Sequence, residues 1–480
     1  MKKITIIGAG LGGLTAGALL AKDGYKVTLL EQHTIVGGCA TTFKRGNFSC
    51  EVGLHEMDGV YTNPAIMNIF TELNIYNSLE FVSADEFFEV STTFGKFKMP
   101  NGVDQAQQAL IEKFPKEEKG IKRYFKTIAK VGDNFEKLEK LSWYHYAFFP
   151  FLFWNILYYK PKSVTDVLNS MIKDRELKLI LNSNVHYYND QPATLSFLLH
   201  AVAQNSYYRG GGWFIKGGSS QLSNYLAKFI MENKGEVITK ASVVDCSEGR
   251  VVYIRAGETF NIETDITISN LSPAQTYQLY NQPYTEKREN GDAILTIYLG
   301  FSKSLKEIYG DKRAYTNFIF DEVHVSNPFK NSFTFVDYSQ IDSGLTKNNK
   351  SFGVITMLDN IHIDEWHNLN RKNYHKKKRE ILAIMLEKLE KHYPNISNFV
   401  EYSEVATSKT VQRYIKTPNG TAYGFKPTPK QFFRLPKVRS NKIKNLYFTG
   451  QWVIAGGFRP AIMSGGMCRE RINIQEIHLS

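Results

Sequence analysis

Cysteine is scarce in this chain of 480 residues, and no apolar run reaches the roughly 20 residues that a secure membrane span requires. The cysteines are widely scattered and show no metal-ligand spacing: Cys39, Cys50, Cys246 and Cys468. We interpret them as reduced thiols. The sequence therefore argues against a disulfide-stabilised scaffold and a structural zinc domain, and we expect no metal site.

Internal repeats and low-complexity tracts are also missing, which indicates an ordinary globular protein. The length suits two or three domains, and 42% hydrophobic residues are ample for a core. A strand pattern starts at about residue 3, which leaves no room for a signal peptide or transit segment. We therefore expect a cytoplasmic protein, with contact to the inner face of the membrane as an open alternative.

The formal net charge of +12 raises the question of nucleic acid or anionic membrane as a partner. No nucleic-acid-binding module is recognisable, so we expect no nucleic-acid partner. The densest basic run, residues 371–379, opens a helix-like segment, and we interpret it as a solvated face. Contact with anionic lipid is the alternative, because each Lys or Arg near such a surface contributes about 1 kcal/mol.

The N-terminal segment carries the clearest pattern in the chain. After two lysines, a β-branched run over residues 4–7 breaks into glycines at 8–13, resumes as a helix-forming segment to Lys22, and is followed by a second strand pattern over 25–31. This order predicts a buried strand, a tight turn, a helix and a parallel strand. Such a βαβ unit is typical of dinucleotide-binding folds.

Glycine is required at three places in that turn. Gly8 allows the sharp turn, Gly10 allows the backbone to approach a pyrophosphate, and Gly13 lets the helix pack closely on the strand. The amides at the helix N-terminus then point at the phosphates. The candidate phosphate-binding residues here are Gly8, Gly10, Leu11, Gly12 and Gly13.

Glu31 ends the second strand, 18 residues after Gly13, near the offset at which an acid accepts the ribose hydroxyls. A carboxylate there repels a 2′-phosphate, which favours FAD or NAD over NADP. The pair Gly37-Gly38 follows six residues later, and in this the stretch resembles flavoproteins of the glutathione-reductase type. The resemblance favours FAD, although the pair alone could be an ordinary loop turn.

Residues 38–43 (GCATTF) and 48–55 (FSCEVGLH) resemble the opening of the phytoene desaturase, carotenoid isomerase and retinol saturase superfamily of FAD-dependent oxidoreductases. That superfamily usually has aspartate where Glu51 stands, a mild departure. The resemblance implies that Gly38, Cys39 and the backbone around Thr41 lie beside the pyrophosphate. It implies also that Gly53, Leu54 and His55 approach the isoalloxazine. A hydrogen-bonded loop histidine is an equal interpretation of His55.

The C-terminal segment supplies the second pattern. Residues 445–453 read as a strand that ends in Gly450-Gln451, followed by glycines and a helix. Parallel-sheet flavoproteins close in this way, with a polar residue at the ribitol and helix amides under the flavin's pyrimidine edge. Much of the superfamily has an acid where Gln451 stands. The candidate cofactor contacts are Gly450, Gln451, Pro460, Ala461 and Ser464.

The middle of the chain agrees with the superfamily only in layout. We expect helices over 64–79, 105–141, 191–205 and 372–392, and strands over 81–100. A glycine-rich return near residue 210 leads to short strands up to Asn270, and the resemblance implies that the backbone at Val244 meets the adenine. The expected fold is α/β, a Rossmann-like FAD-binding domain with an inserted α+β substrate domain. The FAD-binding domain would comprise 1–79, 206–290 and 411–480, and the substrate domain 80–205 and 291–410.

An aromatic segment over residues 143–159 is too short, and too interrupted by His145, Pro150 and Asn155, for a membrane span. Its Trp and Tyr content is typical of a segment at the membrane interface. A core segment that lines a substrate cavity is the alternative. Both interpretations suit a water-insoluble substrate.

The resemblance implies an FAD-dependent enzyme that desaturates, saturates or isomerises carbon–carbon double bonds of a long apolar polyene or isoprenoid. An FAD-dependent amine or amino-acid oxidase is the alternative, and a non-catalytic prenyl-binding carrier of the GDI type is a third hypothesis. No Ser-His-Asp set or acid/base pair stands out, so no catalytic residue is assigned. The electron partner and the oligomeric state stay open.

Overall fold

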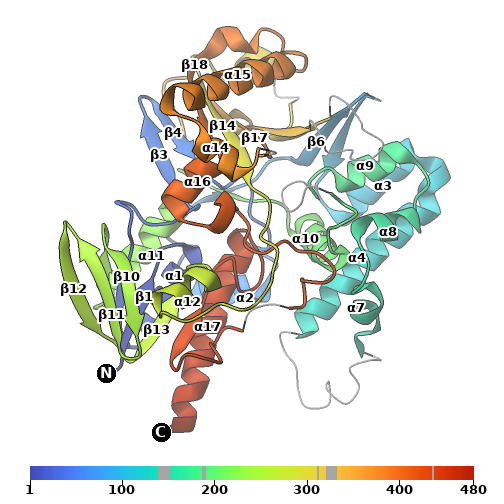
Figure 1. The fold of residues 1–480 in the computed structure, drawn as a ribbon. Helices are drawn as coiled ribbons and strands as arrows, with labels where there is room; N and C mark the ends of the chain where they lie inside the picture. The colour runs from blue at the N-terminus through green and yellow to red at the C-terminus, as the bar shows by residue number, and fades with distance from the viewer. Residues whose placement is uncertain are drawn as a thin grey trace.

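The computed structural model describes residues 1–479 except 94, 139–151, 186–190, 311–312, 321–331, 360 and 435–436. A five-stranded sheet has the spatial order β19 (Leu446–Phe448), β13 (Ile266–Ser269), β1 (Lys3–Ile7), β2 (Lys26–Leu30) and β9 (Glu236–Ile238). Every neighbouring pair is parallel. Three stretches far apart in the chain thus build one sheet, which confirms the predicted α/β class and Rossmann-like layout (Figure 1).

Helix α1 (Leu11–Lys22) follows β1 and is almost entirely buried, because it packs against the sheet and between α11 (Ser220–Glu232) and α17 (Phe458–Leu479). The contact with α17 is close. A Cβ atom at Gly465 would lie 2.7 Å from Thr15 Cβ. The first and last helices of the chain therefore pack nearly backbone to backbone beside the parallel sheet.

A small antiparallel sheet flanks the parallel one. It contains β10 (Ser242–Ser247), β11 (Arg250–Arg255) and β12 (Glu258–Glu263), and α12 (Pro273–Leu279) follows β13. Near the start of the chain, β3 (Thr42–Arg45) and β4 (Phe48–Glu51) form a hairpin.

A second large sheet has seven strands. Their spatial order is β18 (Val400–Ala406), β14 (Ile294–Phe301), β17 (Ser351–Leu358), β16 (Phe333–Asp337), β15 (Thr316–Ile319), β6 (Glu86–Thr92) and β7 (Gly95–Pro100). Only β15 and β6 pair in parallel. Met385 and Leu389 of α15 (Arg371–Glu390) share a buried cluster with these strands. The basic run at the start of α15 is largely exposed to solvent.

Helices form a third layer beside this sheet (Figure 1). They are α3 (Val103–Lys113), α4 (Glu118–Leu138), α7 (Trp154–Tyr159), α8 (Val164–Asn169), α9 (Arg175–Asn182) and α10 (Phe197–Gly210). Ser163 caps α8 in a capping box with Asp166. Shorter helices α13 (Leu305–Tyr309), α14 (Ile363–Asn368) and α16 (Ser408–Ile415) lie beside the large sheet.

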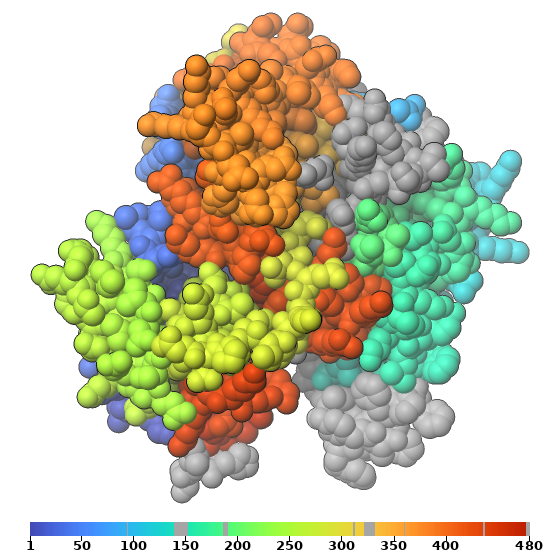
Figure 2. Space-filling view, in the orientation of Figure 1, coloured from blue at the N-terminus to red at the C-terminus, as the bar shows by residue number. Residues whose placement is uncertain are grey.

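Two connecting segments join the layers. The yellow segment after β13 and the orange-red segment before β19 lie side by side in the space-filling view, between the three-stranded sheet and the helical layer (Figure 2). Backbone bridges pair Asn290 with Phe425 and Ala293 with Thr421. The short strands β5 (Phe81–Val82) and β8 (Phe214–Ile215) form an antiparallel pair, which is a further link between the layers.

Two helix boundaries differ from the prediction. The helix expected over 64–79 is α2 (Pro64–Glu72), which ends early because Asn74 adopts a left-handed conformation with φ +56°. The helix expected from residue 191 begins only at Phe197. The amides of Thr194 and Leu195 instead close a turn on the Gln191 carbonyl.

The strands of the five-stranded sheet come from 1–79, 206–290 and 411–480, and those of the seven-stranded sheet from 80–205 and 291–410. The exact domain boundaries stay a prediction. Among the residues that the structure describes, no helix combines the length and apolarity needed to cross a bilayer. Of the aromatic segment 143–159, residues 143–151 lie outside the described residues.

The close contact between α1 and α17 can be tested with Gly465→Ala. We expect a loss of about 1–3 kcal/mol from the added methyl group, which outweighs the gain in helix propensity because backbone atoms of α1 oppose it. Urea unfolding would measure the loss. Gly466→Ala is the matched control, because its nearest neighbour is the flexible Ile69 side chain. An unchanged midpoint for Gly465→Ala would contradict the packing argument.

Candidate cofactor and substrate site

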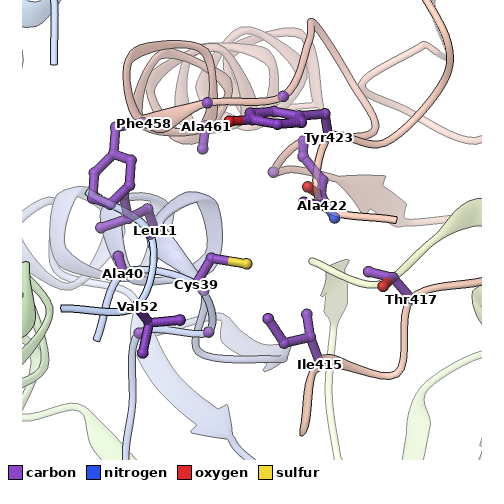
Figure 3. Close-up of a pocket in the computed structure, with 18 of the residues that line it drawn as sticks. Leu11, Cys39, Ala40, Val52, Ile415, Thr417, Ala422, Tyr423, Phe458 and Ala461 are labelled. Carbon is purple, nitrogen blue, oxygen red and sulfur yellow. The ribbon is translucent and has the colours of Figure 1, made fainter. Parts of the chain in front are cut away.

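A cavity of about 360 Å³ lies where the two large sheets and the helical layer meet. Both ends of the chain line it (Figure 3). Of the predicted site residues, its lining includes Gly8, Gly10, Leu11, Gly12, Glu31, Gly38, Cys39, Gly53, His55, Gly450, Gln451, Pro460 and Ala461.

The glycine turn forms one wall of the cavity. A Cβ at Gly12 would lie 2.4 Å from the backbone nitrogen of Gly450, so the N-terminal turn and the C-terminal strand touch. Gly13 does not reach the cavity in the described structure. A Cβ there would lie 2.3 Å from the Gly8 carbonyl oxygen, so Gly13 serves the close packing of helix on strand.

Glu31 lies at the end of β2, as predicted, and is only 8% exposed. Its carboxylate accepts hydrogen bonds from the backbone amides of Ala9 and His33, both at 2.8 Å. The carboxylate therefore holds the glycine turn while it lines the cavity. Such an acid at the end of the second strand suits ribose hydroxyls.

The segment after Glu31 brings Gly38 and Cys39 to the cavity. Gly37 and Gly38 have φ values of +115° and +61°, a region that glycine adopts without strain. Burial raises the pKa of the Cys39 thiol to about 12, so it is neutral. Thr41 lies just before β3, where its carbonyl accepts from Val52, and the described structure does not place it in the cavity lining.

Glu51 has a structural role that sequence reasoning did not assign. Its buried carboxyl group accepts from the amides of Gly53 (3.1 Å), Leu54 (2.9 Å) and Ser219 (2.8 Å), and from Ser219 Oγ (2.6 Å). Burial raises its pKa, and these hydrogen bonds oppose the rise. Leu54 itself points into the core and is fully buried, so Gly53 and His55 line the cavity while Leu54 anchors the segment between them.

Burial also displaces the pKa values of two neighbouring lining residues, His55 and Glu56. Burial lowers the pKa of His55 to about 4 and raises that of Glu56 to about 8, so both are uncharged at neutral pH. Thr316 Oγ1 donates to Glu56 Oε1 at 3.1 Å, and Thr356 Oγ1 lies 3.4 Å from His55 Nε2. Glu56 has no counterpart among the predicted site residues, because no motif marks it.

The C-terminal wall is held together by Ser464. Its hydroxyl oxygen accepts from the Gly450 amide at 2.7 Å and donates to the Ala461 carbonyl at 2.6 Å. Ser464 is fully buried and does not line the cavity in the described structure. The predicted cofactor contact is thus a link between β19 and α17, while Gln451 and Ala461 face the cavity.

Three further lining residues escaped sequence reasoning. Asn270 ends β13 between the glycine turn and Gly450, and its Oδ1 is buried without a hydrogen-bond partner in the described structure. Asp58 and Arg459 form an ion pair at 2.9 Å, with side chains 11% and 12% exposed. Only tertiary packing brings these residues to the cavity, which is why no local pattern reveals them.

In the described structure Val244, the predicted adenine contact, does not line the cavity, unlike its neighbours Ser242 and Val243. A register shift in β10 between Val243 and Asp245 leaves Val244 out of the pairing, and its side chain is 44% exposed. Ser242 and Val243 line the cavity instead. A β-bulge inserts one extra residue into a strand and so changes which side chains face the cavity. A sequence pattern does not reveal where such a bulge lies.

A model of the flavin-containing amine oxidoreductase family matches residues 11–472. The chain belongs to this family. All-trans-retinol 13,14-reductase of Danio rerio is 26% identical over 528 residues, covering 99% of this chain and 86% of that protein. Chloroplastic prolycopene isomerase of Daucus carota is 26% identical over 506 residues, covering 97% of this chain and 79% of that protein. These relatives confirm the phytoene desaturase, carotenoid isomerase and retinol saturase superfamily.

Solved structures of this family share the fold. Cyclohexylamine oxidase from Brevibacterium oxydans has a TM-score of 0.65 at 16% identity and covers 99% of both chains. A putrescine oxidase variant has a TM-score of 0.66 at 15% identity, covering 100% of this chain and 99% of the other. The protein is an FAD-dependent oxidoreductase.

The cavity residues of this flavoprotein fit FAD. The backbone of Gly10 and Leu11 lines the cavity at the start of α1, where a pyrophosphate would lie, and Glu31 lies where ribose hydroxyls would reach it. The unpartnered Asn270 Oδ1 is an acceptor for a ligand hydroxyl. The lining runs from Ile7 and the glycine turn to Gly450 and Gln451 after β19, so both ends of the chain would contact the cofactor.

The assignment of the glycine turn predicts that Gly10→Val abolishes FAD retention, because the new Cβ would lie 2.4 Å from Asn270 Nδ2, so that either Asn270 or the turn that the pyrophosphate would approach must move. Flavin absorbance per mole of purified protein would measure it. The control Gly466→Val makes the same change in α17, away from the cavity. Full flavin occupancy in a folded Gly10→Val variant would contradict the pyrophosphate contact.

Proposed function

We propose that this FAD-dependent oxidoreductase acts on carbon–carbon double bonds of a long apolar polyene or isoprenoid, similar to a retinoid or carotenoid, by saturation, desaturation or cis/trans isomerisation. The retinol reductase and prolycopene isomerase relatives support the substrate class. The cavity supports it independently.

The observation that carries the proposal is the apolar extension of the cavity. Beyond His55 and Glu56, the lining comes from β6, α10 and β15, and it is mainly aromatic and aliphatic: Phe87, Phe88, Leu199, Ala203 and Phe318. Phe88 and Phe318 pack edge to face at 5.3 Å, which keeps this wall closed. Burial of an apolar chain against such a lining stabilises the complex by roughly 25 cal/mol per Å² of buried apolar surface.

The carboxyl groups of the cavity argue against an amine substrate. Glu31 is held by two backbone amides, Asp58 is paired with Arg459, and Glu56 is protonated at neutral pH because of burial. Along the described lining, these three are the acidic side chains. An ammonium group would therefore find no unpaired carboxylate, which disfavours the amine oxidase alternative.

Bound FAD supplies hydride transfer at the reacting double bond. The chain would hold the cofactor with Gly8, Gly10, Gly12, Glu31, Gly38, Gly450, Gln451, Pro460 and Ala461. Its apolar wall positions the polyene and keeps water out, which prevents loss of reducing equivalents to solvent. Tyr423 and Ala422 line the same cavity on the side opposite Cys39 (Figure 3).

Anaerobic incubation with retinoids and carotenoids, using oxidised enzyme and chemically reduced enzyme in parallel, tests this function. We expect a yellow protein that converts at least one polyene, with a product mass two units lower, two units higher or unchanged for the three reactions. Peroxide formation from amines without polyene conversion would favour an amine oxidase. A protein that stays colourless after FAD addition would favour a carrier.

We propose also that the protein contacts anionic membrane through α7. The structure describes the end of the predicted interfacial segment, in which Trp154, Leu157 and Tyr158 are 61%, 38% and 43% exposed. Lys162 Nζ lies 3.6 Å from the centre of the Tyr158 ring. Lys160 Nζ lies 5.4 Å from the ring centre of Phe433. Exposed aromatic rings next to lysines suit an anionic interface from which an apolar substrate enters.

The double variant Trp154→Ala/Tyr158→Ala should weaken binding to vesicles that contain phosphatidylserine by about tenfold, since two rings lose their place at headgroup depth. Co-sedimentation would measure the bound fraction. Ile384→Ala is the control, because Ile384 is 53% exposed on α15, in another part of the molecule. Wild-type binding by the double variant, or equal loss in the control, would contradict contact through α7.

A further inference from the structure

Glu56 lies at the junction of the two halves of the cavity. On one side its neighbours are Gly53 and His55, next to the expected cofactor site. On the other side Tyr207 Oη donates to the Glu56 carbonyl at 3.2 Å, and the Tyr207 ring stacks on Phe87 at 5.2 Å. The Glu56 side chain is thus positioned between the flavin-binding half and the apolar wall.

The carboxyl group of Glu56 occupies a space that the fold keeps open for it. A Cβ at Gly212 would lie 2.1 Å from Glu56 Oε2, so no other residue could stand at 212 without displacing the carboxyl group. Backbone hydrogen bonds between Met57 and Trp213, at 2.8 and 3.0 Å, fix the two segments against each other. Thr316 Oγ1 orients Oε1 from β15. The carboxyl group is therefore held in one place at the cavity wall.

No cation neutralises this carboxyl group within the described structure. Its titratable and charged neighbours are His55 on its own segment, Tyr207 of α10, Tyr315 beside Thr316, and the Asp58–Arg459 ion pair. His55 is neutral, and Arg459 is paired with Asp58. Burial opposed only by the Thr316 hydrogen bond raises the pKa of Glu56 to about 8, so the group carries a proton at neutral pH.

We propose that Glu56 is the proton donor of the reaction with the polyene. This rests on the proposed function and selects saturation among its three reactions. Glu56 gives its proton to one carbon of a double bond, while bound reduced FAD would supply the hydride to the adjacent carbon and be oxidised by two electrons, so that two C–H bonds replace the π bond. The Glu56 carboxylate regains its proton from water after the product leaves.

The sign of the pH dependence follows from the raised pKa. Protonated Glu56 is the active form, so saturation by reduced enzyme is fastest below pH 8 and falls tenfold per pH unit above it. A general base would show the opposite slope. A rate that rises through pH 8 would overturn the donor assignment.

The test compares wild-type holoenzyme with Glu56→Gln, which keeps the shape and the hydrogen bond from Thr316 but holds no transferable proton. We expect single-turnover saturation to fall by about 100-fold or more, with FAD occupancy and polyene binding within twofold of wild type. Glu232→Gln, an exposed carboxyl on α11, is the matched control. In heavy water, two deuterium atoms per product should come from solvent in the wild type, one through the Glu56 carboxyl group and one through the exchangeable hydrogen of the reduced flavin.

Infrared spectroscopy supplies a readout without turnover. Wild-type holoenzyme should show a protonated-carboxyl band at neutral pH that disappears near pH 8, and Glu56→Gln should lack it. Absence of this band in the wild type, or wild-type rates in Glu56→Gln, overturns this inference alone. A wild type that binds FAD but leaves every polyene unchanged overturns the proposed function and this inference together. If the variant does not fold, the wild-type band and pH profile still decide.

Discussion

The close contact between the glycine turn and the C-terminal strand is the constraint on which the site depends. Only a residue without a side chain at Gly12 lets the start of α1 reach the backbone of Gly450. The strand order places β13 between β1 and β19, so Asn270 at the end of β13 fills the gap between the two segments. Because parallel strands bring their carboxyl ends to one edge, three distant stretches of chain meet there at a single ligand site.

In the half of the cavity away from the glycine turn, burial of the titratable groups determines their protonation. His55 and Glu56 have pKa values displaced in opposite directions by the same cause, and both displacements favour the neutral form. Where the cavity does hold charge, at Asp58 and Arg459, the charge is paired. A wall of neutral groups next to apolar side chains can bind a polyene without desolvating an ion, and a neutral carboxyl group is at the same time able to give up a proton.

Local patterns were sufficient for the parts of the site that depend on local backbone geometry. Glycines after a β-branched strand specify the turn at Gly8–Gly13, and the Gly450–Gln451 strand end is equally local, so both could be predicted. Glu56 could not, because its burial depends on β15 and on the segment at Gly212, which are distant in sequence. The one-residue difference between Val243 and Val244 comes from a bulge that only strand pairing reveals. Ser464 was predicted as a cofactor contact, whereas its hydroxyl group binds the Gly450 amide and the Ala461 carbonyl between β19 and α17.

Glu51, which stands where the resemblance to the superfamily implies aspartate, connects these observations. Glutamate is one methylene longer, and the structure accommodates it because Gly218, at φ +90°, leaves the space beside it open: a Cβ there would lie 2.9 Å from Glu51 Oε2. The longer side chain reaches the start of α11 at Ser219 and also accepts from the amides of Gly53 and Leu54. A single buried carboxyl group thus ties the segment that carries His55 and Glu56 to the flavin-binding layer. Together with the backbone bonds between Met57 and Trp213, these hydrogen bonds fix the cavity wall, so the position of His55 and Glu56 depends in part on a residue that does not itself line the cavity.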